Sequence, residues 1–199
     1  MTWKGDEYQA RFDALAAEGV DVHGEVDFLM RLSPRTVLDA GCGTGRVAIE
    51  LARREVAVVG VDGDESMIAT ARARAPELEW VLADIATLDL GRTFDVVVMA
   101  GNVPLFTPPG TQAALVAGCA RHVAPGGAVV AGFSLDREYG LDRYDADAAA
   151  AGLVLVERHA TWDRAPFTGG DYAVSVHRAR SEPQESRASA QEITAALRG

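Results

Sequence analysis

The chain has 199 residues, of which 48% are hydrophobic and 24% charged, a balance typical of a globular protein with one buried core rather than of a fibrous or disordered chain. Its formal net charge of -10 repels the negatively charged phosphate backbone of DNA and RNA, so a nucleic acid is not expected as a partner. Apolar runs fall short of the ~20 residues that span a bilayer, and the N-terminus lacks the apolar stretch of a secretory signal, so no membrane contact is expected.

Two helices are predicted before the first strand. Apolar residues recur there at helical spacing in two groups, which are Tyr8, Phe12 and Leu15, then Val22, Val26, Leu29 and Met30. Pro34 separates the second group from the strand that follows.

Short apolar runs and helical patterns then alternate along the chain. Strands are predicted over 36–38, 56–61, 80–82, 94–99 and 128–133, with helices over 46–53, 65–75 and 111–123. Pro125-Gly126-Gly127 is expected to break the last helix before its strand. The alternation predicts an α/β fold in which a mostly parallel sheet has helices on both faces.

The C-terminal part completes the predicted sheet. A helix over 144–151 ends at Gly152, and two strands follow over 153–161 and 172–179. Residues 162–170 between them are too few for a parallel crossover, so these strands are expected to pair antiparallel. We therefore expect one seven-stranded domain over 1–180, with helices within 1–34, and a polar tail over 181–199.

A glycine-rich loop, Gly41-Cys42-Gly43-Thr44-Gly45, joins the first strand to the next helix. Such a loop lets a nucleotide-like ligand approach the backbone and the N-terminus of the helix. The dinucleotide pattern requires a sixth-position glycine for close packing of helix and strand, and Arg46 occupies that place. An NAD-dependent oxidoreductase is therefore the weaker interpretation.

Three aspartates accompany the loop. Asp39 precedes it, and Asp62 and Asp84 each follow one of the next two strands. Each alone is readable as a surface carboxylate, but together they are suited to a cation, to ribose hydroxyls and to an adenine amino group. The pattern favours an adenosine ligand that carries positive charge and no phosphate.

Residues 37–45, with this loop, resemble the first motif of the class I S-adenosylmethionine-dependent methyltransferases. Residues 60–67 resemble the second motif and 83–85 the third, and 94–97 and 125–127 resemble the later strand motifs. The resemblance covers roughly residues 35 to 135. It implies a Rossmann-like fold, S-adenosylmethionine as cofactor and S-adenosylhomocysteine as product.

The resemblance also assigns expected roles to individual residues. The methionine part of the cofactor would lie along the glycine loop near Asp39, the adenosine would lie at the next two strand ends, and the methyl group would face the segment after the fourth strand. The cofactor-binding residues so implied are Asp39, Gly41, Gly43, Asp62 (ribose), Met67 (adenine face), Asp84 and Ile85 (adenine edge), and Ala100. Asp64 is expected to cap the following helix instead.

No catalytic residue and no metal site is assigned. The four histidines lack metal-ligand spacing, and a salt-bridged turn is the plain interpretation of Trp162-Asp163-Arg164. Trp3, Tyr8 and Phe12 are interpreted as a lid over the cofactor, with core packing as an equal or better interpretation of Phe12. Residues 100–106 depart from the Asn/Asp-Pro-Pro-Tyr/Phe pattern of enzymes that methylate nucleobases or glutamine.

These observations favour a methyltransferase for a small-molecule acceptor. The alternative is a non-catalytic S-adenosylmethionine binder with a regulatory or assembly role. The two cysteines, Cys42 and Cys119, form no disulfide or zinc pattern, which favours a reducing, cytoplasmic location.

Overall fold

The computed structural model describes residues 23–180 together with Gly5, Gln9, Ala10, Ala14 and Glu18. The predicted helix based on Tyr8, Phe12 and Leu15, and the predicted tail over 181–199, lie outside the described residues. Val22 also lies outside them, and the second predicted helix is present as α2 (Gly24–Met30).

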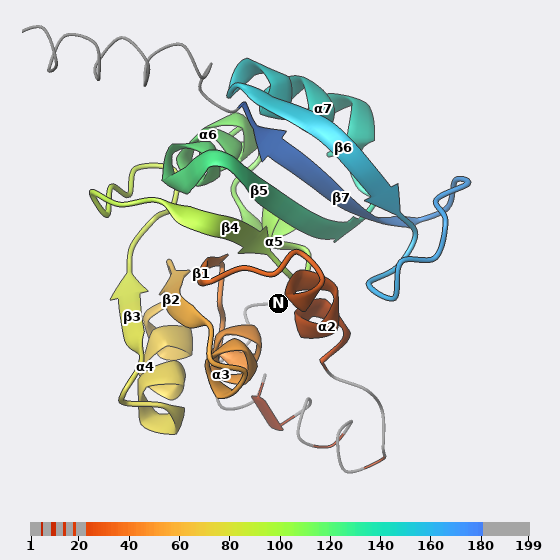
Figure 1. The fold of residues 1–199 in the computed structure, drawn as a ribbon. Coiled ribbons are helices and arrows are strands. Elements are labelled where there is room, and N and C mark those ends of the chain that lie inside the picture. The colour runs from red at the N-terminus through yellow and green to blue at the C-terminus, as the bar shows by residue number, and fades with distance from the viewer. Residues whose placement is uncertain (1–4, 6–8, 11–13, 15–17, 19–22, 181–199) are drawn as a thin grey trace, which may run out of the picture.

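A seven-stranded sheet forms the centre of the molecule, with the order β3-β2-β1-β4-β5-β7-β6 (Figure 1). The strands are β1 (Thr36–Ala40), β2 (Ala57–Asp62), β3 (Glu79–Leu82), β4 (Phe94–Met99), β5 (Val123–Ser134), β6 (Leu153–His159) and β7 (Tyr172–Ala179). The other helices are α3 (Arg46–Arg53), α4 (Glu65–Arg74), α5 (Val103–Phe106), α6 (Gln112–His122) and α7 (Leu141–Ala150).

The direction of the strands confirms the predicted sheet. Strands β1 to β5 pair in parallel, whereas β7 pairs antiparallel with both β5 and β6. The last strand of the chain is therefore inserted between β5 and β6, and β6 forms the edge. In β6, Val154, Leu155 and Val156 remain 47%, 38% and 47% exposed.

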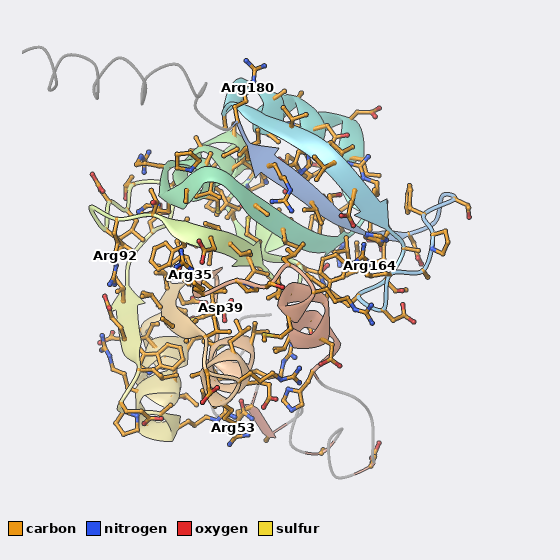
Figure 2. All side chains as sticks on the ribbon, in the orientation of Figure 1. Arg35, Asp39, Arg53, Arg92, Arg164 and Arg180 are labelled. Carbon is orange, nitrogen blue, oxygen red and sulfur yellow. The ribbon has the colours of Figure 1, made fainter. Side chains whose placement is uncertain are left out.

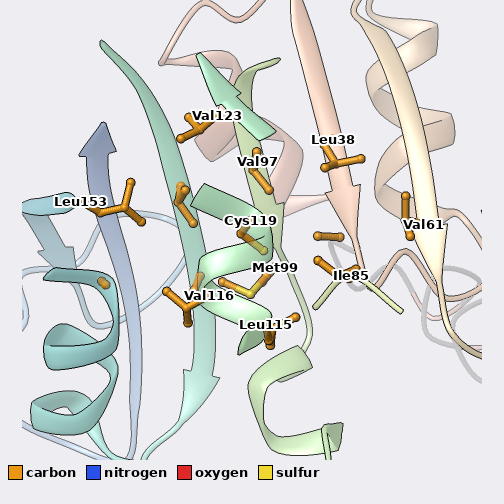
Figure 3. Packing of buried hydrophobic residues seen from close by; sticks show 14 of the residues in the cluster. Leu38, Val61, Ile85, Val97, Met99, Leu115, Val116, Cys119, Val123 and Leu153 are labelled. Atoms are coloured by element: carbon orange, nitrogen blue, oxygen red, sulfur yellow. The ribbon is translucent and has the colours of Figure 1, made fainter. Parts of the chain in front are cut away.

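Helices cover both faces of the sheet, as the alternation of elements predicted. Helices α2 and α3 pack on one face through residues such as Phe28 and Leu51. On the other face, Leu115, Val116 and Cys119 of α6 pack against the apolar side chains of the central strands (Figure 3). Within the described residues, no helix is long and apolar enough to cross a membrane.

Besides shifts of a few residues at element ends, two features differ from the prediction. The predicted break at Pro125-Gly126-Gly127 is wrong, because β5 already begins at Val123 and continues through these residues. A register shift against β4, between Phe94 and Val96, and a φ of +76° at Gly126 accommodate them. The short helix α5, which contains Pro104, was not predicted.

Candidate functional site

The glycine loop is held to the end of β2 by its own backbone. The N–H groups of Gly41 and Cys42 both donate to the carbonyl of Val61, at 2.8 and 2.9 Å. Gly41, Gly43 and Gly45 have φ values of +81°, +54° and +82°, a region that other residues rarely adopt. The glycines are thus required by the backbone path, which places Gly45 at the N-cap of α3.

Asp39 lies inside the protein at the carboxyl end of β1, with 1% of its surface exposed (Figure 2). Its Oδ2 accepts a hydrogen bond from the Ala48 N–H at 3.2 Å. Burial raises the pKa of Asp39 to about 7, although the nearby charge of Arg46 and the Ala48 hydrogen bond act in the opposite direction. A negative charge here is therefore costly until a cation approaches it.

Asp62 ties the glycine loop to the turn before α4. Its Oδ2 accepts from the Gly43 N–H at 2.8 Å, and its Oδ1 accepts from the Asp64 N–H at 2.9 Å. Burial raises its pKa, while these hydrogen bonds oppose the shift. Each carboxylate oxygen has a second acceptor position, so the group can still receive ligand hydroxyls.

The next turn confirms the capping prediction for Asp64. Its side chain accepts hydrogen bonds from the N–H groups of Ser66 and Met67, at 2.7 and 3.2 Å. The hydrogen bond from Ser66 lowers the pKa of Asp64. Met67 is fixed in the first turn of α4 and remains half-buried.

Asp84 and Ile85 occupy different environments. Asp84 is exposed and accepts from the Ala86 N–H at 2.9 Å, whereas Ile85 is buried in the core below α6. Gly118 of α6 makes this approach possible, since a Cβ there would lie 2.1 Å from the carbonyl oxygen of Ile85. The side chain of Ile85 thus belongs to the core, and its backbone borders the strand end.

The segment after β4 folds back over the loop. Ala100 follows the strand and is 9% exposed, and the side chain of Asn102 accepts from the Ser134 N–H at 2.8 Å. Val103 then covers Gly41, because its Cγ atoms lie 2.6 and 2.7 Å from where a Cβ on that glycine would be. This contact, which α5 creates, was not predictable from the sequence.

Arg46, the residue that follows the glycine loop, forms an ion pair with an acidic neighbour. Its guanidinium binds Glu25 of α2 in a bidentate pair, with Nη1–Oε2 at 2.9 Å and Nη2–Oε1 at 2.5 Å. Both side chains are largely buried, at 14% and 15% exposure. The pair fixes α2 against the first turn of α3.

A second group lies at the loop between β6 and β7, where the sequence analysis assigned only a salt-bridged turn. Trp162 donates its indole N–H to the Tyr172 hydroxyl at 2.9 Å and packs edge-on against Phe28. Both side chains lie over Gly132 of β5, where a Cβ would be 2.3 Å from Trp162 Cζ2. Residues 160–162 and 169–172 line a cavity of about 350 Å³ there. An isolated glycine in a strand was the available signal.

Two of the histidines and Cys42 make contacts that serve the packing of the fold. His122 accepts from the Leu90 N–H at 3.1 Å, and His177 is buried on β7, 3.2 Å from Asp145. Burial raises the pKa of the Cys42 thiol, which fits a packing role. In the described part of the chain, no group of three or more potential metal ligands occurs.

The residues predicted as a lid, Trp3, Tyr8 and Phe12, lie outside the described residues. Two described neighbours contact the site region. The Thr44 hydroxyl donates to Gln9 Oε1 at 2.6 Å, and the Gly5 N–H donates to Ser66 Oγ at 3.3 Å. The described N-terminal residues thus contact both the glycine loop and α4.

Comparison with known proteins gives consistent matches. Residues 37–127 match the family model of a methyltransferase domain. A TehB-like SAM-dependent methyltransferase from Corynebacterium glutamicum superposes with a TM-score of 0.82 at 31% identity, covering 89% of this chain and 98% of that one.

Two curated relatives are longer than this chain. The cypemycin N-terminal methyltransferase of a Streptomyces species is 38% identical over 100 residues, 49% of this chain and 41% of the relative. The ubiquinone biosynthesis O-methyltransferase of Alkalilimnicola ehrlichii is 33% identical over 150 residues, 63% of this chain and 58% of the relative. The chain thus spans about half the length of these relatives.

Proposed function

Because this chain belongs to the family of S-adenosylmethionine-dependent methyltransferases, we propose that it transfers a methyl group from S-adenosylmethionine to a small-molecule acceptor. Among the residues of the site, one observation supports the proposal most directly. Asp39 and Asp62, two largely buried carboxylates beside the glycine loop, have no ion-pair partner within 4.0 Å among the described residues. A sulfonium cation with an ammonium group would supply the direct ionic contact that these carboxylates lack.

The residues present fit this cofactor in further ways. Gly41 and Gly43 have the positive φ values of a tight loop that a ligand can approach, and a Cβ at Gly63, beside Asp62, would meet only the Ala83 carbonyl oxygen at 3.9 Å. We assign Asp39 and the two loop glycines to the methionine part and Asp62 to the ribose hydroxyls. Met67, Asp84 and the backbone of Ile85 would hold the adenine, and Ala100 would border the methyl group.

When bound, the cofactor supplies an electrophilic methyl group on a positively charged sulfur. The task of the chain is to hold this group in line with the acceptor, and positioning of this kind lowers a barrier by up to roughly 7–11 kcal/mol. Asp62 contributes by fixing both the loop, through Gly43, and the turn at Asp64. Val103 contributes by packing against Gly41 and so restricting the movement of the loop. We assign no general base.

We also propose a cytoplasmic location and a small acceptor. Both cysteines are free and buried, which is consistent with a reducing compartment. The net charge of -10 supports an acceptor other than a nucleic acid.

Calorimetry with S-adenosylmethionine, S-adenosylhomocysteine and NAD tests the proposal. We expect saturable binding of the first two and no binding of NAD. A folded protein that ignores S-adenosylmethionine at millimolar concentration overturns the cofactor assignment. Binding without turnover across a broad acceptor panel would instead favour a non-catalytic binder.

The affinity for S-adenosylmethionine is expected to depend on pH through Asp39. Since burial raises the pKa of Asp39 to about 7, the free protein holds a proton there that a bound cation displaces. The affinity should therefore fall about tenfold from pH 8 to pH 6, as the ionised fraction falls about tenfold across pKa 7. Calorimetry in buffers of different ionisation enthalpy would measure the released proton.

The variant Asp39→Asn isolates this effect from Asp62, whose pKa is also raised. It should bind more weakly at pH 8 and show a flatter pH dependence than the parent. The folded-state pKa of Asp39 lies above its ordinary value, so the ligand-free parent should lose stability as pH rises toward 7. An unchanged pH profile in the variant would assign the dependence to another group.

A further inference from the structure

The cavity at the loop between β6 and β7 lies at the carboxyl end of the parallel strands, as the proposed cofactor site does. Strand β6 runs in the direction of β1 to β5, because β7 is antiparallel to both β5 and β6. Tyr172 begins β7 opposite Ser134, the last residue of β5. The charges of Glu25 and Arg46 act on the Tyr172 hydroxyl, and Arg46 begins the helix after the glycine loop.

Two aromatic side chains form a fixed wall of this cavity. The hydrogen bond between Trp162 and Tyr172 joins them, and Phe28 contacts Trp162 with a ring-centroid distance of 5.5 Å. Gly132 leaves the space that both occupy, since a Cβ there would lie 2.7 Å from the Tyr172 hydroxyl oxygen. The wall is therefore positioned before any ligand binds.

The Tyr172 hydroxyl stays neutral at physiological pH. Burial raises the pKa of Tyr172 to about 12, with the charge of Glu25 acting in the same direction. The phenol therefore serves as a hydrogen-bonding wall of the cavity and not as a base.

The charge of the cavity has one sign. Asp171 supplies the one carboxylate of the lining, and none of the lining residues is a lysine, arginine or histidine. The arginines nearby are paired with carboxylates. Arg46 binds Glu25 at 2.5 Å, and Arg164 binds Glu157 at 2.6 Å while lying over the ring of Phe28. An anionic ligand would meet Asp171 without a cation to balance it.

We propose that this cavity binds the methyl acceptor and that the acceptor carries a primary or secondary amine, which arrives as an ammonium ion. Aromatic faces attract such a cation, and Asp171 can accept a charge-assisted hydrogen bond from it. The inference rests on the proposed methyl transfer and adds the chemical class of the acceptor to it.

The reaction balances with these participants. The ammonium ion first releases one proton to solvent, which frees the nitrogen lone pair. That lone pair forms the N–C bond to the methyl group as the C–S bond breaks, and the sulfonium becomes a neutral thioether. The product is the methylated ammonium ion, so each turnover releases one proton.

Three probes that share one ring and differ in one group test the proposal: cyclohexylamine, cyclohexanol and cyclohexanecarboxylate. Their binding to the full chain is followed by saturation-transfer NMR in the presence of S-adenosylhomocysteine. We expect the amine to bind at least about tenfold more tightly than the carboxylate, a difference equivalent to ~1.4 kcal/mol. Asp171→Asn should remove this preference. The matched control Asp136→Asn changes an exposed carboxylate outside the cavity and should retain it.

The other outcomes contradict either the amine acceptor site or the proposed function, and the two cases are distinguishable. Equal binding of the three probes, a preference for the carboxylate, or no binding of any probe up to about 50 mM overturns the amine acceptor site. A preference that survives in Asp171→Asn also overturns it. Loss of S-adenosylhomocysteine binding in the parent chain would instead contradict the proposed function, and calorimetry registers that separately.

Discussion

Replacing Gly118 with alanine is expected to destabilise the folded chain by about 1–3 kcal/mol, although alanine is the better helix former by ~1 kcal/mol. The reason is the contact between α6 and the chain below it. The new Cβ would lie 2.1 Å from the Ile85 carbonyl oxygen and 2.9 Å from its carbonyl carbon, and backbone atoms cannot rotate away as a side chain does. Thermal unfolding measures the effect, at roughly 2–4 °C per kcal/mol for a chain of this size.

A matched variant on the same helix separates packing from helix propensity. Ala114 is exposed on α6, so Ala114→Gly should cost only the ~1 kcal/mol of propensity. If Gly118→Ala instead raises the melting temperature, the close contact between Gly118 of α6 and the Ile85 carbonyl group is contradicted. Since Ile85 borders the proposed adenine position, the destabilised variant should also bind S-adenosylmethionine more weakly.

Asp62→Ala is expected to weaken S-adenosylmethionine binding by about 1–3 kcal/mol, or roughly 5- to 150-fold in Kd. Two losses combine in this variant. The ribose hydroxyls lose a charged acceptor, and the N–H groups of Gly43 and Asp64 lose the oxygens that hold the loop and the turn in place. Calorimetry on a variant shown to be folded by circular dichroism measures the change.

Asp89→Ala provides the control for Asp62. Asp89 accepts from the Gly91 N–H at 2.8 Å, the same two-residue turn contact that Asp62 makes with Asp64, but it is exposed in a loop before β4. Its replacement should leave cofactor affinity unchanged. Full affinity in a folded Asp62→Ala chain would remove that carboxylate from the site.

Features set by neighbouring residues were predictable from the sequence. The glycine loop follows from glycines that must adopt positive φ, and the capping by Asp64 follows from its position before a helical pattern. The helix over Arg46–Arg53 and the strand over Phe94–Met99 have the predicted bounds, because their patterns are long and regular. Because neighbouring parallel strands end on the same side of the sheet, the prediction also placed Asp39 and Asp62 together at the carboxyl ends of the strands.

Features set by distant contacts were not predictable in the same way. The partner of Arg46 was not predictable, because only the packing of α2 on α3 selects Glu25. Gly132 and Gly118 signal that something approaches closely, yet the sequence does not say that Trp162 and the backbone of Ile85 do so. The short loop predicted that the last two strands are antiparallel, and it allowed either of them to lie beside β5.

The position of β7 between β5 and β6 imposes an order on biosynthesis. As the ribosome releases the chain from its N-terminus, β6 has no strand to join until Tyr172–Ala179 has also emerged. During that interval the apolar run Leu153–Val156 is a free strand that can associate with other chains. A nascent chain stopped before Tyr172 would leave β6 unpaired and β5 paired with β4 alone, so premature termination should produce aggregates rather than a smaller folded protein.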